Sequence, residues 1–182
     1  MQLAGRKRDY MSRAILVRAG AAAGFVGGAL RAVASFAPGV GSDRELQVLY
    51  LVIDVFLLLG VLGFYELRHE DIGRTGAVGF VMSLVGLAVV RSSRAIPGVD
   101  LYPVGALTFA AGVLALSASA WKAKTLTAWV PIAFLVSTLA GVVGAVVDSA
   151  GWLFVLSGVV FGVGFAGLGH GTWSAGREQP GT

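Results

Sequence analysis

The sequence predicts an all-α membrane protein, a polytopic transmembrane bundle of six helices that forms one integral membrane domain over residues 1–182. Six apolar stretches fill the chain almost from end to end, and the polar breaks between them are only about 4 to 11 residues long. Most stretches come close to the roughly 20 apolar residues that a helix needs to cross a bilayer. The composition agrees, with 56% hydrophobic and 13% charged residues and a mean hydropathy of +0.80.

Signals for helix ends separate the spans, which are expected at about 15–37, 45–67, 75–90, 102–121, 126–147 and 152–173. The first span is predicted to end at Pro38 and Gly39, because proline lacks a backbone N–H and glycine is flexible. The second is predicted to begin at Ser42, which is followed three residues later by Glu45 in the pattern of a capping box.

Two later breaks also contain charged residues. The break between the third and fourth spans includes Arg91 and Arg94. The fifth and sixth spans are joined by a tight turn at residues 148–151, in which Asp148 is placed to cap the sixth helix. Only residues 174–182 are expected to form a tail.

Basic residues are distributed unevenly between the two sides of the expected bundle. Of 14 Lys and Arg residues, ten fall on the side of the termini, three fall on the opposite side, and Arg31 lies inside the first span. Cytoplasmic loops of membrane proteins carry an excess of Lys and Arg. The count therefore predicts a multi-pass protein of the cell membrane with both termini in the cytoplasm. It also explains the net charge of +4 without a nucleic-acid partner.

The first span has some features of a cleavable signal peptide. Arg6, Lys7 and Arg8 would form its basic beginning, and residues 32–34 imitate a small-residue cleavage site. Against cleavage, Arg31 interrupts the stretch that should stay apolar. An uncleaved first helix is therefore the favoured interpretation.

Short glycine-containing segments recur in the odd spans and in the even spans at intervals of about 50 to 55 residues. Three tandem helical hairpins of like orientation would produce this pattern. Glycine is frequent in membrane helices generally, so chance similarity explains the pattern equally well.

Glycines four positions apart mark faces where membrane helices approach closely. Gly20, Gly24 and Gly28 share one face of the first span, and Gly158 and Gly162 share one face of the sixth. Where side chains are absent, two backbones come close enough for extensive van der Waals contact. These glycines are therefore predicted to pack helices, within the bundle or against a partner.

Ionisable residues inside the spans are candidates for function, because a charge near the bilayer centre costs roughly 2.5 to 3.5 kcal/mol. Arg31 and Asp54 lie at similar depths on adjacent helices when about 1.5 Å is counted per residue. Tyr50 lies one turn from Asp54 on the same helix face. We expect these three residues to form a polar seam with an ion pair between Arg31 and Asp54. A structural explanation is favoured over a functional one: either a clasp that fixes the first hairpin, or an Arg31 side chain that extends to the membrane interface while Asp54 bonds to a neighbouring Ser or Thr.

A second polar group is expected on the side opposite the termini. Arg91, Arg94 and Asp148 would join the polar seam there and line an outward-facing mouth for an anionic or zwitterionic ligand. For the two arginines, a solvated loop surface that meets water and lipid phosphates is the simpler explanation. For Asp148, the alternative is the helix cap described above.

Other kinds of chemistry have little support in the sequence. The chain has no Cys, and therefore no disulfide, thiolate ligand or thiol nucleophile. Glu66, His69 and Glu70 are spaced to share a helix face, but the second histidine, His170, belongs to a distant span. Neither a metal site, a cofactor, catalytic residues nor a nucleic-acid partner is predicted.

Two functions of different classes remain. The first is a non-catalytic membrane scaffold or accessory subunit that acts among membrane lipids with a second copy or a partner membrane protein. The second is a small carrier or channel-like protein in which the polar seam opens outward and Asp54 exchanges a proton. The small size of the bundle favours a homo-oligomer or a partner in either case. The lack of paired Pro/Gly interruptions near mid-membrane favours the scaffold.

Overall fold

The computed structural model describes residues 2–36, 42–93 and 100–178, and within these ranges it contains six long α-helices and no strands. The helices are α1 (Gln2–Ala34), α2 (Asp43–Arg68), α3 (Gly73–Ser92), α4 (Tyr102–Lys122), α5 (Trp129–Val146) and α6 (Trp152–Glu178), with a short 3-10 helix η1 (Asp148–Ala150) before α6. Each long helix contains an apolar segment of 18 to 26 residues, enough to cross a membrane. The predicted all-α bundle of six transmembrane helices is confirmed.

The helices differ from the predicted spans mainly at their ends. α1 begins at Gln2 rather than near residue 15 and ends at Ala34 rather than at 37, while α6 continues to Glu178 rather than stopping at 173. Hydropathy marks the part of a helix that lies in lipid, whereas the helix continues into its polar flanks when the residues there favour helical backbone. Span ends are therefore poor guides to helix ends.

The turn before α5 explains why this helix starts at Trp129 rather than near residue 126. Lys124 adopts a left-handed conformation with φ of 59°. The backbone N–H of Thr125 donates to the carbonyl of Ala120 at 2.9 Å, which closes the end of α4. Leu126 is buried although it precedes α5, so its hydrophobicity reflects packing of the turn.

The predicted capping box at the start of α2 is confirmed. The backbone N–H of Ser42 donates to Oε2 of Glu45 at 2.7 Å, and the N–H of Glu45 donates to Oγ of Ser42 at 3.4 Å. The predicted stop at Pro38 and Gly39 lies outside the described residues. The last described turn of the first span is made by Ser35 and Phe36, which follow the end of α1.

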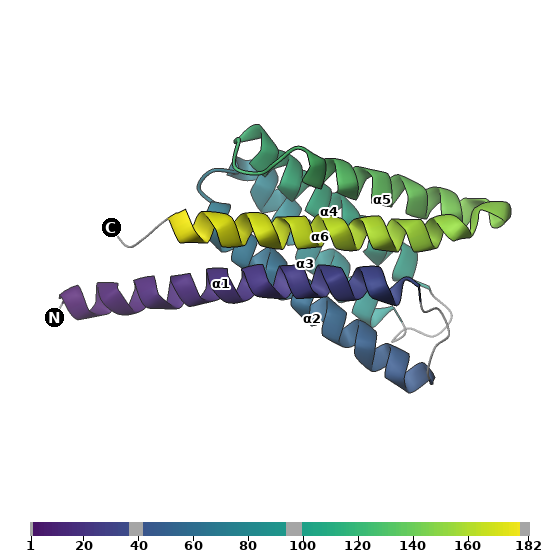
Figure 1. The fold of residues 1–182 in the computed structure, drawn as a ribbon, viewed down its shortest axis with the longest axis horizontal. Coiled ribbons are helices and arrows are strands. Elements are labelled where there is room, and N and C mark those ends of the chain that lie inside the picture. Colours follow the sequence, from purple (N-terminus) through teal and green to yellow (C-terminus); the bar gives the residue numbers. More distant parts are fainter. Residues whose placement is uncertain (1, 37–41, 94–99, 179–182) are drawn as a thin grey trace.

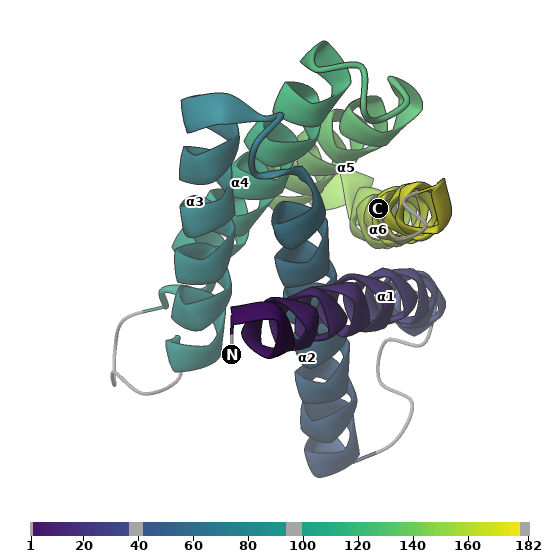
Figure 2. The same cartoon turned by 90° about the vertical axis from the view of Figure 1, so that its left-hand side faces the viewer.

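The six helices run alternately in opposite directions, so α1 begins and α6 finishes at the same end of the bundle (Figure 1). Consecutive helices pack as three hairpins, and the sequence-distant pair α1 and α6 also packs extensively. The α3–α4 hairpin contacts the remaining helices much less, through α2 and α5. The bundle therefore consists of a four-helix body, made of α2, α1, α6 and α5, and a hairpin docked against it (Figure 2).

α1 approaches α2 through glycines on both helices. A Cβ atom added to Gly20 would lie 2.6 Å from Cα of Gly63, and one added to Gly24 would lie 3.3 Å from Cα of Gly60. Contacts this close require bare backbone on both sides. The predicted packing role of Gly20 and Gly24 is thus fulfilled inside the chain.

The other side of the glycine face of α1 meets α6. A Cβ atom added to Gly28 would lie 2.5 Å from the backbone nitrogen of Ala166, and one added to Gly162 would lie 2.7 Å from the backbone nitrogen of Ala32. α1 therefore lies against two helices at once, because its small residues cover a wide arc of its surface.

The α3–α4 hairpin is packed in the same way, by glycines for which no packing role was predicted. A Cβ atom on Gly79 would lie 2.7 Å from the backbone nitrogen of Leu116, and one on Gly86 would lie 2.6 Å from Cα of Phe109. α4 faces them with Gly105 and Gly112, which are also close to the backbone of α3. The hairpin is consequently a tight unit.

Four phenylalanines join α4, α5 and α6 in the core. The rings of Phe109, Phe134, Phe161 and Phe165 have centroids 5.1 to 6.0 Å apart, several of them in tilted or edge-on contacts. Phe134 and Phe165 are fully buried. α2 completes the core with side chains at helical spacing, namely Ile53, Leu57, Val61 and Phe64.

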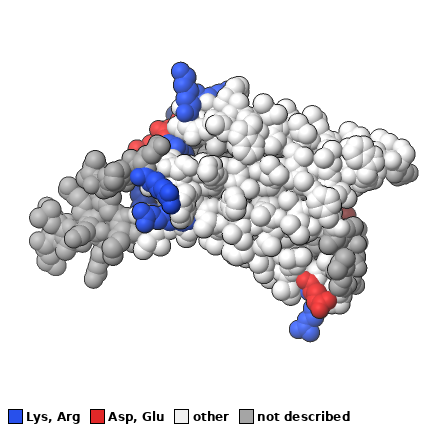
Figure 3. All heavy atoms as spheres, in the orientation of Figure 1, with Lys and Arg blue, Asp and Glu red and all other residues white. Residues whose placement is uncertain are grey.

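Most of the outer surface is apolar. Figure 3 shows Lys and Arg side chains gathered at the end of the bundle where the termini lie, while the middle of that face is largely uncharged. Large apolar side chains are exposed on the outer faces of the helices, for example Val81 on α3 and Leu139 on α5. Such a surface suits contact with lipid tails.

Candidate polar site within the membrane

Asp54 of α2 forms an ion pair with Arg91 of α3. Nε of Arg91 donates to Oδ2 of Asp54, and Nη2 of the same guanidinium contacts the same oxygen. The side chain of Asp54 is only 16% exposed and that of Arg91 is 36% exposed. A charge-assisted contact through two nitrogens fixes both side chains. The ion pair predicted between Arg31 and Asp54 is therefore not the one that forms.

Arg91 reaches Asp54 because α3 is longer than predicted. The third span was expected to stop near residue 90, but α3 continues to Ser92 and so carries Arg91 in its last turn. Asp54 lies near the middle of the apolar segment Arg44–Arg68. Arg91 is therefore part of α3, one residue before the end of the apolar segment Gly73–Ser92, rather than part of the expected loop, and its side chain, although 36% exposed, neutralises the Asp54 carboxylate.

Arg31 of α1 lies against an aromatic ring. Its guanidinium carbon is 5.8 Å from the ring centroid of Tyr50 on α2, within the range of a cation–π interaction. Its charge is also near enough to act on Asp54. The structure thus brings Arg31, Tyr50 and Asp54 to one region and adds Arg91. The polar seam in the structure consists of these four residues.

α6 passes beside the polar seam at a position without a side chain. A Cβ atom added to Gly158 would collide with Oγ of Ser35 and would lie 3.5 Å from the guanidinium carbon of Arg31. Oγ of Ser35 donates to the carbonyl of Arg31 at 2.9 Å. Gly158 was predicted to pack helices, and it does so by making room for Ser35 and Arg31. Ser35 was missed, although its position four residues after Arg31 places it on the same helix face.

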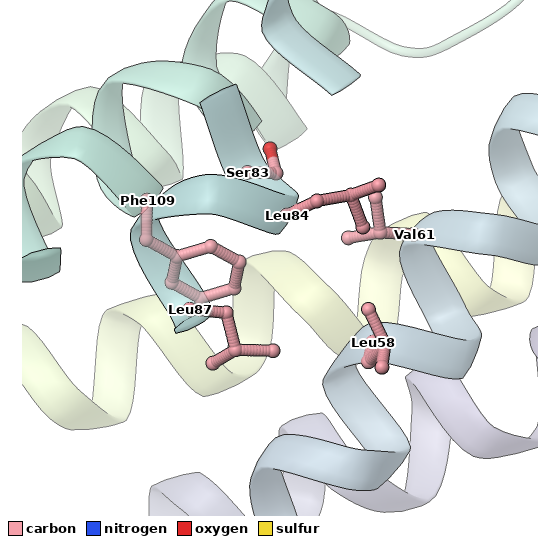
Figure 4. A pocket seen from close by; sticks show the side chains of 6 residues that line it. All are labelled: Leu58, Val61, Ser83, Leu84, Leu87 and Phe109. Atoms are coloured by element: carbon pink, nitrogen blue, oxygen red, sulfur yellow. The ribbon is translucent and has the colours of Figure 1, made fainter. Parts of the chain in front are cut away.

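A narrow apolar gap separates α2 from α3 one turn away from the ion pair (Figure 4). Its lining residues are Leu58, Val61, Ser83, Leu84, Leu87 and Phe109, and the space between them does not admit a water molecule. The hydroxyl of Ser83 donates to the carbonyl of Gly79 at 2.8 Å, so it needs no partner in the gap. The ion pair therefore sits beside a dry interface rather than beside a cavity.

The position of two predicted site residues relative to the seam lies outside the described part of the structure. Arg94 lies outside the described residues. Asp148 begins η1, and its side chain also lies outside the described part of the chain. Three residues were predicted to join the seam and form an outward-facing mouth. Arg91 is the one of them whose side chain is described, and it is engaged with Asp54.

Carboxylates near the other end of the bundle are engaged in separate contacts. Oε1 of Glu66 lies 2.9 Å from Nε of Arg13, an ion pair that links α2 to α1. Among the described residues, no group of three or more His, Asp and Glu side chains converges to hold a metal ion. The polar seam is accordingly the site whose chemistry needs an explanation.

Comparison with models of protein families, with curated proteins and with solved structures finds no match for this chain.

Proposed function

We propose that this chain is a non-catalytic membrane scaffold or accessory subunit in which the ion pair between Asp54 and Arg91 is a structural clasp. The ion pair is the observation that carries the proposal, because the carboxylate is already neutralised by two nitrogen atoms of one guanidinium. The gap beside it is dry. The clasp joins the α3–α4 hairpin to the four-helix body, where contacts between helices are least extensive.

A scaffold needs a surface for its partner, and α2 supports such a surface. The first turns of α2 extend beyond the neighbouring helices (Figures 1 and 2). Their outer face exposes the apolar side chains Val48, Leu51, Val52 and Val55. Helices in lipid associate through packing of such faces. We expect this outer face of α2 to receive a second copy of the chain or a partner membrane protein.

A double-mutant cycle on the clasp tests the first part of the proposal. Asp54→Asn and Arg91→Gln should each lower the thermal stability of the purified protein, because each leaves a partner unpaired at membrane depth. The double variant should lose less than the sum of the two. Glu70→Gln is the matched control, since its side chain is 79% exposed. Additive losses would contradict a clasp.

Single-cysteine crosslinking tests the second part. The chain has no Cys, so one introduced residue reports on one surface. Val48→Cys and Val55→Cys should crosslink in native membranes, whereas Val81→Cys on α3, which is similarly exposed, should not. A product of twice the monomer mass indicates a second copy, and a product of another mass indicates a different partner. Equal crosslinking at all three positions would contradict a specific face.

A second candidate is the carrier or channel-like function, and Arg31 is the observation that favours it. Within the described residues Arg31 makes no ion pair and lies on Tyr50 instead. A guanidinium that forms no ion pair, three residues inside the end of the apolar segment Arg13–Ala34, is suited to an anionic or zwitterionic ligand. The loosely attached α3–α4 hairpin would provide the moving element, since carriers work by rocking one helical unit against another.

Flux measurements separate the two functions. In a carrier, Asp54→Asn and Arg31→Gln should abolish substrate-dependent proton movement into proteoliposomes while leaving folding nearly normal. In a scaffold, the same variants should lower stability, and the unmodified protein should show no flux above that of empty liposomes. A pH-sensitive dye inside the vesicles provides the measurement.

We further propose that the protein resides in the cell membrane with both termini in the cytoplasm. Described basic residues at the end where the termini lie support this orientation, namely Arg13, Arg18, Arg68, Arg74, Lys122, Lys124 and Arg177. Reporter fusions at each terminus test it. A reporter that is active only in the cytoplasm should be active at both termini. Opposite locations for the two termini would contradict the six-span topology.

A further inference from the structure

A hollow lies between α1 and α6 near the end of the bundle where the termini lie, far from the polar seam. It has a volume of about 210 Å³ and is lined by Arg18 of α1 and by Trp173, Gly176 and Arg177 of α6. None of these four residues is acidic. Two guanidinium groups from different helices therefore border one concave space.

The arginine and tryptophan of α6 are already arranged with respect to each other. The guanidinium carbon of Arg177 is 5.4 Å from the ring of Trp173, one helical turn away. A cation–π contact holds a guanidinium while leaving its N–H groups free to donate. Gly176, between them in the sequence, lines the hollow without a side chain. Among the described side chains that line it, the hollow is therefore positively charged.

The depth of the hollow matches the head-group region of a bilayer. Arg177 is the last residue of the apolar segment of α6, and Arg18 lies five residues inside the apolar segment that starts at Arg13. At about 1.5 Å per residue, Arg18 lies roughly 7 Å below the segment end. Tryptophan is enriched at this level of membranes. A ligand in the hollow would therefore sit between water and acyl chains.

We propose that this hollow binds the phosphate group of an anionic phospholipid in the leaflet at the end where the termini lie. Guanidinium groups match phosphate oxygens in geometry as well as in charge, and they donate in pairs. Basic recesses between transmembrane helices are suited to anionic head groups. The acyl chains would leave the hollow along the apolar surface of α1 and α6. This site is independent of the function proposed for the polar seam.

Lipid binding to the purified protein tests the proposal. The protein is titrated in detergent with a phosphatidylglycerol and, separately, with a phosphatidylcholine of the same chain length, and bound lipid is counted by native mass spectrometry. The anionic lipid should bind more tightly. Arg18→Gln and Arg177→Gln should each weaken its binding about fivefold, and the double variant should bind both lipids alike.

Three controls make the result decisive. Arg74→Gln removes one positive charge at the same end outside the hollow and should leave lipid binding unchanged. Arg177→Lys keeps the charge but cannot donate in pairs, so its affinity should fall between those of the wild type and Arg177→Gln. Thermal unfolding of each variant shows that the fold is intact.

Competition with inorganic phosphate identifies the source of the phosphate group. If the lipid stays bound at millimolar phosphate, the ligand is the head group. If phosphate displaces the lipid with the same dependence on Arg18 and Arg177, the site serves a soluble phosphate compound. Equal lipid affinity in the wild type and the double variant, or an equal loss in Arg74→Gln, would overturn the proposal.

Discussion

Gly20 of α1 and Gly63 of α2 approach so closely that neither position has room for a side chain. A Cβ atom added to Gly20 would lie 2.6 Å from Cα of Gly63, and one added to Gly63 would lie 2.7 Å from Cα of Gly20. Membrane helices lack a hydrophobic driving force for association, so close packing of this kind supplies much of the stability.

The substitution Gly20→Leu should therefore separate α1 from α2. We expect a loss of about 3 kcal/mol, because the obstructing atoms belong to backbone and cannot move aside. Ala22→Leu is the control, since Ala22 lies on an exposed face of the same helix. Thermal midpoints from size-exclusion chromatography after heating provide the comparison. A similar midpoint for both variants would show that the α1–α2 contact is dispensable.

Removal of the capping box should loosen the start of α2 without unfolding the bundle. Ser42→Ala deletes the hydroxyl that accepts from the backbone N–H of Glu45, and such losses cost about 1 kcal/mol. Hydrogen exchange of the first turn of α2 should become faster, while exchange around Phe64 should not change. Uniform acceleration along the whole helix would contradict a local role for the cap.

The aromatic contact of Arg31 predicts a difference between two substitutions of Tyr50. Tyr50→Phe keeps the ring and should leave stability nearly unchanged, whereas Tyr50→Leu should cost about 1 kcal/mol through loss of the cation–π interaction. In an Arg31→Gln background, both substitutions should have the same effect. If Tyr50→Phe is as harmful as Tyr50→Leu, the hydroxyl group rather than the ring is important.

Truncation of a core phenylalanine should be the most destabilising apolar change. Phe165 is fully buried among three other phenylalanine rings, so Phe165→Ala should cost about 3 to 5 kcal/mol through the cavity it creates. Val163→Ala is the control, because Val163 is 49% exposed on the same helix. Equal thermal midpoints for the two variants would contradict the position of the aromatic core.

The number of helices and the cap of α2 were predictable because both depend on local sequence. Apolar length identifies a span, and Ser42 with Glu45 satisfies backbone groups within one turn. Helix ends were less predictable, and this affected the site. Arg91 was assigned to a loop because hydropathy falls before it, although α3 continues for one more residue beyond it.

The partner of Asp54 could not be found by counting depth along ideal helices. Counting assumes that neighbouring helices are parallel to the membrane normal and start at the same level, whereas tilt and helix length differ between neighbours. The glycines of α3 and α4 were missed for another reason. Gly79 and Gly86 are seven residues apart, as are Gly105 and Gly112, whereas the predicted packing faces consist of glycines four residues apart. Two helical turns span seven residues, so this spacing also marks one face.

The pairing of α1 with α6 determines when the molecule can be completed during its synthesis. Among the six described helices, α1 leaves the ribosome before the other five and α6 leaves after them, yet the two pack extensively against each other. Until α6 enters the bilayer, the backbone around Gly28 that it will cover stays available to lipid or to the insertion machinery. A nascent chain halted before α6 would therefore expose an unfilled groove on α1, which quality-control proteases of the membrane could recognise.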